Sequence, residues 1–211
     1  MSLEDTRREY KYDSLTKESL KNCPIDQFSC WMENALSSDL PDPTAMSLAT
    51  INTNGRPWQR TVLLKQFDKK GFVFYTNFES RKALEIKNNP NVSLLFPWFN
   101  LDRQVIIGGR VEKISETESL SYFKKRPRAS QLAAWSSIQS SKLISREALE
   151  KEFFRVEKKY AEVDVPFPEF WGGYRVVPVE IEFWQGGKYR LHDRFQYILD
   201  NQEWTIFRLS P

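Results

Sequence analysis

Apolar and polar residues alternate along much of this chain, and a period of two predicts β-strands. The alternating segments are rich in β-branched and aromatic residues, and turn dipeptides such as Asn54-Gly55 and Gly186-Gly187 separate them. We therefore expect antiparallel strands joined by short connections. These strands are expected at residues 45–53, 58–67, 72–76, 92–96, 104–114, 174–184, 189–199 and 204–209.

Other segments place apolar residues three and four positions apart, which predicts helices with one apolar face. Ser115 and Glu118 have the spacing of a capping box, and Pro90 and Pro127 predict helix ends. Residues 1–24 are charged and irregular and are expected to form an arm ahead of a single domain over 25–211. The helices are expected at 25–36, 79–88, 115–123, 128–135 and 146–160.

Antiparallel strands with helices inserted between them indicate an α+β fold around a closed or partly closed β-barrel with peripheral helices. A length of 211 residues fits one domain with a sizeable core. The chain has neither the Gly-rich dinucleotide fingerprint after a strand nor the phosphate-binding P-loop. Neither of these nucleotide-binding folds is therefore supported.

Composition narrows the class of protein further. Hydrophobic residues make up 40% of the chain and aromatic residues 14%, which excludes a disordered chain. The aromatic residues are numerous enough to line a pocket. A net charge of +3 does not indicate a nucleic-acid binder. Cys23 and Cys30 lie seven residues apart with no histidine nearby, so neither a metal site nor a disulfide scaffold is expected. No leader or membrane-spanning segment is apparent, and we expect a cytoplasmic protein.

The one histidine of the chain, His192, lies between two arginines in Arg190-Leu191-His192-Asp193-Arg194. If this run is a strand, alternation places Arg190, His192 and Arg194 on one face. Two guanidinium groups beside an imidazole disfavour its charged form and lower its pKa. Such a face suits an anionic or electron-rich ligand better than a metal ion.

Four further segments carry cations or hydrogen-bonding groups that could bind phosphate. Arg60 and Lys65 end a mostly apolar strand, although cations in such places often only extend to solvent. Tyr75-Thr76-Asn77 and Ser80-Arg81-Lys82 precede or open a helix, where free backbone N–H groups favour anions. Tyr122, Arg126 and Ser130 are spaced by four, and Gln139-Ser140-Ser141 forms a polar loop. Each signal alone is weak.

Taken in order, these and neighbouring motifs form a specific set that extends from Arg7-Arg8-Glu9-Tyr10 to Arg208-Leu209-Ser210-Pro211. Between these two ends, the motifs of the set are Asp42-Pro43-Thr44-Ala45-Met46, residues 60–65, Val73-Phe74-Tyr75-Thr76-Asn77, Ser80-Arg81-Lys82-Ala83, residues 92–98, Arg126-Pro127-Arg128, Phe170-Trp171-Gly172-Gly173, residues 182–187 and residues 190–194. Over nearly its whole length the chain resembles the pyridoxamine/pyridoxine 5′-phosphate oxidases, which are FMN enzymes that make pyridoxal 5′-phosphate.

The resemblance implies an antiparallel, Greek-key-like split β-barrel that forms a homodimer with FMN at the interface. It places one group of residues around the FMN phosphate and its ribityl chain, a second along the cofactor, and a third near the isoalloxazine. In that order these are Arg60, Arg81, Lys82, Gln139 and Ser140; then Thr61, Val62, Leu63, Leu64, Lys65, Tyr75 and Thr76; then Gln104, Trp184 and Arg194.

The resemblance also implies a substrate site for pyridoxamine 5′-phosphate and pyridoxine 5′-phosphate. Lys65, Tyr122, Arg126 and Ser130 would bind the substrate phosphate. Arg190, Leu191 and His192 would hold the pyridine ring, and Arg7, Arg8, Glu9 and Tyr10 would close over it as a lid. Asp42, Arg190 and His192 are the candidates for proton handling, and the sequence does not rank them.

The chemistry implied is hydride transfer from C4′ of the substrate to FMN, which then reduces dioxygen to hydrogen peroxide. The amine substrate would release ammonia. A flavin reductase that uses a nicotinamide or deazaflavin donor is the alternative on the same barrel. The second cationic cluster argues against it, because a second phosphorylated ligand explains that cluster.

Overall fold

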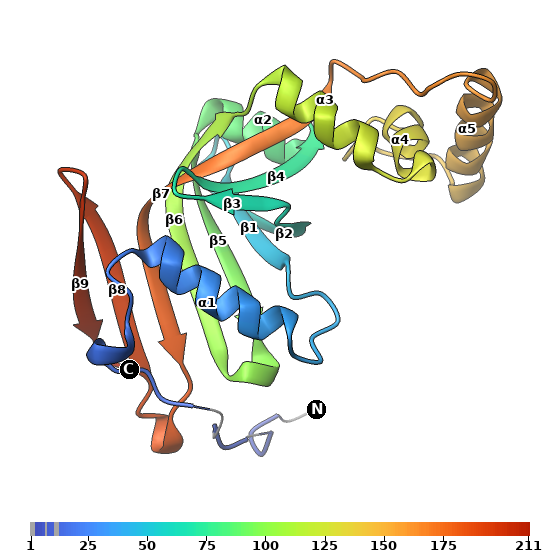
Figure 1. Ribbon diagram of the computed structural model, residues 1–211. Helices are drawn as coiled ribbons and strands as arrows, with labels where there is room; N and C mark the ends of the chain where they lie inside the picture. Colours follow the sequence, from blue (N-terminus) through green and yellow to red (C-terminus); the bar gives the residue numbers. More distant parts are fainter. Residues whose placement is uncertain (1–2, 7, 11–12) are drawn as a thin grey trace.

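The computed structural model describes residues 3–6, 8–10 and 13–211 as one antiparallel sheet with helices around it (Figure 1). The main path through the sheet is β2-β1-β5-β6-β7-β4-β3, and β8 and β9 extend from β7. The strands are β1 (Ala45–Ile51), β2 (Pro57–Leu63), β3 (Gln66–Asp68), β4 (Gly71–Asn77), β5 (Asn91–Trp98), β6 (Arg103–Lys113), β7 (Trp171–Gln185), β8 (Asp193–Asp200) and β9 (Glu203–Leu209).

The helices lie outside the sheet, as expected for an α+β fold. Ser115 Oγ accepts a hydrogen bond from the Glu118 N–H at 3.1 Å, and the Glu118 carboxylate accepts one from the Ser115 N–H at 3.2 Å, which confirms the predicted capping box. The α-helices are α1 (Pro24–Leu36), α2 (Arg81–Asn88), α3 (Glu116–Lys125), α4 (Arg128–Trp135) and α5 (Arg146–Lys159). Short 3₁₀ turns are η1 (Lys17–Ser19), η2 (Phe99–Leu101) and η3 (Lys188–Arg190). No described helix is long and apolar enough to cross a membrane.

The two edges of the main sheet path are neighbours in sequence. β2 lies at one edge and β3 at the other, and Leu64 and Lys65 alone connect them. The Leu64 N–H donates to Thr44 O at 2.9 Å and the Lys65 N–H donates to Val73 O at 2.9 Å. The sheet must therefore curl into a barrel, and the single strand predicted over 58–67 is wrong because the chain changes edge at this point.

β7 changes its neighbour halfway along its length, and this change splits the barrel. Its first half pairs with β4 and its second half with β8, while β6 pairs with it from Tyr174 to Gln185. Pro178 lies at the changeover, where a missing N–H costs no ladder bond to β4 or β8. On β6, opposite this point, the pairing register shifts between Gly108 and Gly109. A Cβ on Gly109 would lie 2.4 Å from Val177 O. Glycine is required there.

Aromatic packing fixes α1 against the barrel. Phe28 is fully buried, and its ring centroid lies 5.0, 4.9 and 5.0 Å from those of Phe67, Phe72 and Phe96. Leu15 of the N-terminal segment is 4% exposed and joins this core, so the described part of that segment is not wholly peripheral. A second, smaller core under α3, α4 and α5 includes Trp171 at the start of β7.

Candidate active site

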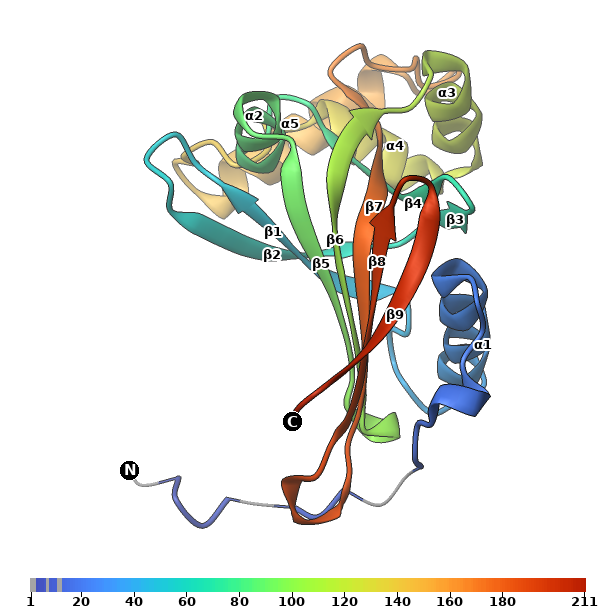
Figure 2. The ribbon, with the colours of Figure 1, turned by 90° about the vertical axis from the view of Figure 1, so that its left-hand side faces the viewer.

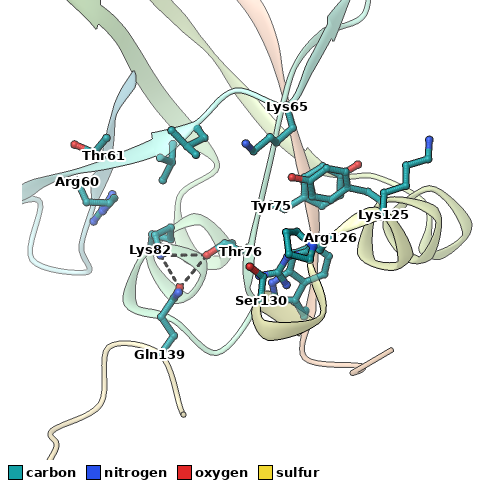
Figure 3. Close-up of a pocket in the computed structure, with 15 residues that line it drawn as sticks. Arg60, Thr61, Lys65, Tyr75, Thr76, Lys82, Lys125, Arg126, Ser130 and Gln139 are labelled. Atoms are coloured by element: carbon teal, nitrogen blue, oxygen red, sulfur yellow. Dashed lines mark hydrogen bonds between the residues drawn. The ribbon is translucent and has the colours of Figure 1, made fainter. Parts of the chain in front are cut away.

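A cavity of about 520 Å³ opens beside β2 and β4, where α3 and α4 meet the barrel (Figure 3). It brings together residues that the sequence analysis took from separate segments. Cations from three of those segments line it, and the tyrosines of β4 and α3 lie between them. The lining residues are Arg60, Thr61, Val62, Leu63, Lys65, Tyr75, Thr76, Lys82, Tyr122, Lys125, Arg126, Pro127, Ser130, Gln139 and Trp171.

Lys82 forms the centre of the first cationic group in this cavity. Its Nζ lies 3.1 Å from Thr76 Oγ1, 2.8 Å from Gln139 Oε1 and 3.3 Å from Ser80 Oγ (Figure 3). Within residues 3–6, 8–10 and 13–211, no carboxylate hydrogen-bonds to this ammonium group. Burial, and to a lesser degree the charge of Arg60, lowers the pKa of Lys82 to about 8. A buried cation held by neutral oxygens is arranged to receive an anion.

We expect Lys82→Met to raise the unfolding free energy of the ligand-free protein at pH 7. The folded pKa of about 8 lies below the ordinary 10.5, so below pH 8 the buried charge destabilises the fold in full. Between pH 8 and pH 10.5, Lys82 loses its proton in the folded chain but keeps it in the unfolded chain. The unfolding free energy of the wild type therefore rises, and the advantage of the variant becomes smaller. The shift limits the gain to about 3 kcal/mol.

Urea unfolding of the ligand-free protein at pH 7 and pH 10 measures this difference. Lys87→Met, which removes an exposed lysine from the same helix, is the matched control. An equal gain at both pH values would show that the charge of Lys82 is not the cause.

Arg126 forms the second cationic group, at the turn between α3 and α4. Its Nη1 is buried and has no hydrogen-bond partner among the described residues. Its guanidinium carbon lies 4.7 Å from the ring centre of Trp171, which holds the group in place by a cation–π contact. Burial lowers the pKa of Arg126, although the group stays charged. The unpaired nitrogen is therefore a donor that a ligand anion can satisfy.

Stacked aromatic rings lie beside the second cationic group. Tyr75 and Tyr122 stack with centroids 4.0 Å apart at 19°, and Tyr75 and Trp171 stack at 5.3 Å and 10°. Tyr122, Arg126 and Ser130, which are spaced by four along the chain, line one cavity. Trp171 and Lys125 were missed, although Trp171 lies in the quoted Phe170-Trp171-Gly172-Gly173 motif and is the buried aromatic beside the arginine.

Several residues predicted for the same group lie beside the cavity and not in its wall. Leu64 is 4% exposed and belongs to the main core. Arg81 and Ser140 line a neighbouring cavity of about 480 Å³, which shares Gln139 with the first. Arg60 does line the first cavity, but it is already paired with Glu85 at 3.1 Å.

A second cluster lies at the end of β7 that leads into β8, which is the end of the sheet away from α3 and α4 (Figures 1 and 2). Gln104, Trp184, Arg8 and Tyr10 contribute there to a cavity of about 330 Å³. Trp171 and Trp184 mark the two ends of β7, and the residues between them span about 40 Å of extended strand. Within one chain, the structure therefore does not bring Gln104, Trp184 and Arg194 to the Lys82 and Arg126 groups.

The strand predicted around His192 is wrong at its start. β8 begins only at Asp193, because Tyr189 and Arg190 adopt left-handed backbone angles, with φ of 55° and 65°, in a tight turn. The predicted shared strand face of Arg190, His192 and Arg194 therefore does not exist. Arg194 instead pairs with Glu182, with Nε–Oε1 at 2.8 Å and Nη2–Oε2 at 3.1 Å.

The direction of the predicted pKa shift of His192 is nevertheless confirmed. Burial contributes most and the charges of Arg190 and Arg194 contribute less, and together they lower the pKa of His192. The Gly187 N–H donates to His192 Nδ1 at 3.1 Å, which leaves Nε2 to carry the proton of the neutral ring. Tyr10 packs edge-on against this ring with centroids 5.3 Å apart. His192 is thus held as a neutral donor.

The remaining candidates are placed less favourably. Asp42 is exposed in the connection before β1 and lines neither the Lys82–Arg126 cavity nor the Trp184 cavity in the described part of the chain. Glu9 is exposed and Leu191 is 70% exposed. Arg8 pairs with Asp102 at 2.5 Å and donates to Phe99 O at 2.8 Å. Arg7 lies outside the described residues.

Comparisons with known proteins agree with this geometry. Residues 32–160 match the family model "Pyridoxamine 5′-phosphate oxidase", and residues 171–211 match "Pyridoxine 5′-phosphate oxidase C-terminal dimerisation region". Two relatives carry the name "Pyridoxine/pyridoxamine 5′-phosphate oxidase". That of Shewanella sediminis is 56% identical over 99% of both chains, and that of Teredinibacter turnerae is 54% identical over 100% of both.

Solved structures support the fold. The crystal structure of PhzG from Burkholderia lata 383, in complex with tetrahydrophenazine-1-carboxylic acid, has a TM-score of 0.89 at 29% identity, covering 94% of this chain and 98% of that one. A pyridoxamine 5′-phosphate oxidase-related, FMN-binding protein from Nostoc punctiforme has a TM-score of 0.73 at 19% identity, covering 92% and 99%. The predicted split barrel is thereby confirmed.

Proposed function

The chain belongs to the pyridoxamine 5′-phosphate oxidase family of FMN-dependent oxidoreductases in vitamin B6 metabolism, and from this premise we propose its substrates, its electron acceptor and the roles of its residues. The substrates are pyridoxamine 5′-phosphate and pyridoxine 5′-phosphate, and dioxygen accepts the electrons. The amine, water and dioxygen give pyridoxal 5′-phosphate, ammonia and hydrogen peroxide. The alcohol and dioxygen give pyridoxal 5′-phosphate and hydrogen peroxide.

One observation carries this proposal: a single cavity contains two separate cationic groups. Lys82 among neutral oxygens and Arg126 with its buried unpaired Nη1 each fit a phosphate. FMN and a phosphorylated pyridine supply two phosphates, whereas one phosphorylated ligand leaves a cationic group without a partner. We assign Lys82, Arg60 and Gln139 to the FMN phosphate, with Arg81 and Ser140 beside them. We assign Lys65, Tyr122, Arg126 and Ser130 to the substrate phosphate.

When bound, FMN supplies hydride acceptance from the substrate carbon and two-electron reduction of dioxygen. The side chains of the cavity bind FMN and the substrate and orient them toward each other. Thr61, Val62, Leu63, Tyr75 and Thr76 line the space between the two cationic groups and would exclude water from it.

The second cluster completes the site from the partner subunit in a homodimer. Trp184, Arg190, His192 and Arg194 all fall within the matched dimerisation region, at the end of β7 far from the cavity. Exposed apolar side chains next to both clusters support an interface there, since Trp58 is 52% and Leu191 70% exposed.

In this dimer, Gln104, Trp184 and Arg194 of the partner subunit lie near the isoalloxazine. Arg190 and His192 of the partner subunit hold the pyridine ring, with the His192 Nε2–H as a donor. The predicted lid, residues 7–10, would close over the ring, and its Tyr10 packs against His192 of the same chain. Asp42 receives no role, because its placement brings it to neither cluster.

An oxygen-uptake assay of the purified, FMN-loaded protein tests the reaction. We expect each substrate to drive oxygen uptake without a reduced nicotinamide, with one hydrogen peroxide formed for each pyridoxal 5′-phosphate. A requirement for a reduced nicotinamide or deazaflavin would instead support the flavin reductase alternative. Failure to oxidise either substrate would overturn the proposal.

A further inference from the structure

A buried carboxylate lies beside the Lys82 group, where an anion would be expected to weaken the binding of another anion. Glu85 of α2 is 6% exposed. Its Oε2 accepts hydrogen bonds from Thr50 Oγ1 at 2.5 Å and Arg60 Nη2 at 3.1 Å, and its Oε1 accepts one from Arg81 Nε at 2.8 Å. Burial alone would raise the pKa of Glu85, but these hydrogen bonds outweigh burial and lower it, so the group is ionised.

These contacts hold both arginines in fixed positions. Arg60 Nη1 also donates to Leu48 O at 3.0 Å and to Thr50 Oγ1 at 2.5 Å, so its guanidinium is anchored to β1 as well as to α2. The Arg81 guanidinium lies 4.0 Å from the ring centre of Trp58. Glu85 is the group that the two arginines share, and Lys82 makes no such contact with it in the described structure.

The charges in this group balance only when Glu85 is counted. Arg60, Arg81 and Lys82 are three cations close together. Burial lowers the pKa of Arg60 most, Glu85 opposes this, and the charge of Arg81 lowers it slightly further; burial and then the charge of Arg60 lower the pKa of Lys82. With the Glu85 carboxylate, two net positive charges remain. A phosphate monoester carries close to two negative charges above pH 6.

We propose that Glu85 is a positioning residue that orients Arg60 and Arg81 and matches the charge of this site to a phosphate dianion. The inference rests on the proposed function, in which the Lys82 group binds the FMN phosphate. Glu85 would not contact FMN. It acts by fixing the arginines before the cofactor arrives, which removes the cost of ordering two long side chains on binding.

The test compares FMN with riboflavin, which has the same ring system and no phosphate. Flavin fluorescence quenching gives the dissociation constant of each for the apoprotein of the wild type and of Glu85→Gln. We expect Glu85→Gln to weaken FMN binding about tenfold and to leave riboflavin binding within about twofold. Thr50→Val removes the hydroxyl between Arg60 and Glu85 with little change in volume, and we expect a smaller loss in the same direction. It keeps the test available if Glu85→Gln does not fold.

Glu157→Gln, which removes an exposed carboxylate on α5, is the matched control and should change neither constant. Unchanged or tighter FMN binding in both Glu85→Gln and Thr50→Val would overturn the inference, as would a parallel loss of FMN and riboflavin binding. Lys82→Met distinguishes a failure of this inference about Glu85 from a failure of the proposed phosphate site. If Lys82→Met reduces the preference for FMN and Glu85→Gln does not, the role of Glu85 alone is wrong. If Lys82→Met leaves that preference unchanged, the phosphate site itself is misplaced.

Discussion

We expect Arg126→Ala to raise the KM for pyridoxamine 5′-phosphate about 100-fold while kcat stays within a few-fold of the wild type and FMN remains bound. The Arg126 guanidinium lies over Trp171, and its buried, unpaired Nη1 is a donor that a ligand anion can satisfy. Loss of charge-assisted hydrogen bonds of this kind costs about 3 kcal/mol, which corresponds to a factor of about 100. The loss falls on binding because the phosphate takes no part in the oxidation.

Steady-state oxygen uptake and the flavin absorbance of the purified variant measure this effect. Lys124→Ala removes an exposed cation two residues away and should leave the KM near the wild-type value. Pyridoxamine without its phosphate should be a poor substrate of both the wild type and Arg126→Ala, with little difference between them. Loss of flavin from Arg126→Ala would show that this group binds the FMN phosphate and that the two sites were assigned the wrong way round.

We expect two variants that are each nearly inactive at low substrate concentration to restore activity when their chains are mixed, provided that they affect opposite ends of β7. Arg126→Ala disables the cavity, and the double variant Arg190→Ala/His192→Ala disables the second cluster. In a dimer whose sites each combine one cavity with the second cluster of the partner subunit, the mixed dimer has one intact site. Random pairing makes half of the dimers mixed, so about a quarter of the wild-type activity returns.

The chains are unfolded together, refolded at equal amounts with FMN, and assayed at a substrate concentration far below the KM of Arg126→Ala. Mixing Arg126→Ala with Lys65→Ala, which alters the same cavity, is the control and should restore nothing. If the first mixture recovers no more activity than this control, the second cluster does not complete the cavity of the partner subunit and the proposed dimer is wrong.

Local signals predicted most helices of the fold because helix ends depend on neighbouring residues. The Ser115–Glu118 capping box is present as expected, and the predicted helix over 128–135 matches α4. The strand predicted over 58–67 fails because the change of sheet edge at Leu64 and Lys65 depends on barrel closure. A local pattern of ten residues does not indicate where the barrel closes.

The convergence of side chains on one cavity could be expected where spacing along the chain sets spacing in the fold. Tyr122, Arg126 and Ser130 follow one another across a single turn, so their convergence could be inferred. The turn at Tyr189 and Arg190 was missed because neither residue type favours left-handed backbone angles. Glu85 was missed because a lone glutamate on a helix is usually solvated, and its burial follows from contacts with Thr50 and Arg60, which are distant in sequence.

The continuity of β7 limits how this sequence can change over evolutionary time. One strand carries Trp171 at one end and Trp184 at the other, and it pairs with β6 from Tyr174 to Gln185. Inserting or deleting one residue within it would turn every later side chain to the opposite face. A change of two residues would keep the faces but shift one end by about 7 Å. Relatives should therefore vary in length after Ser141 in the connection between α4 and α5, where Ile144 is 97% exposed, and not between residues 171 and 185.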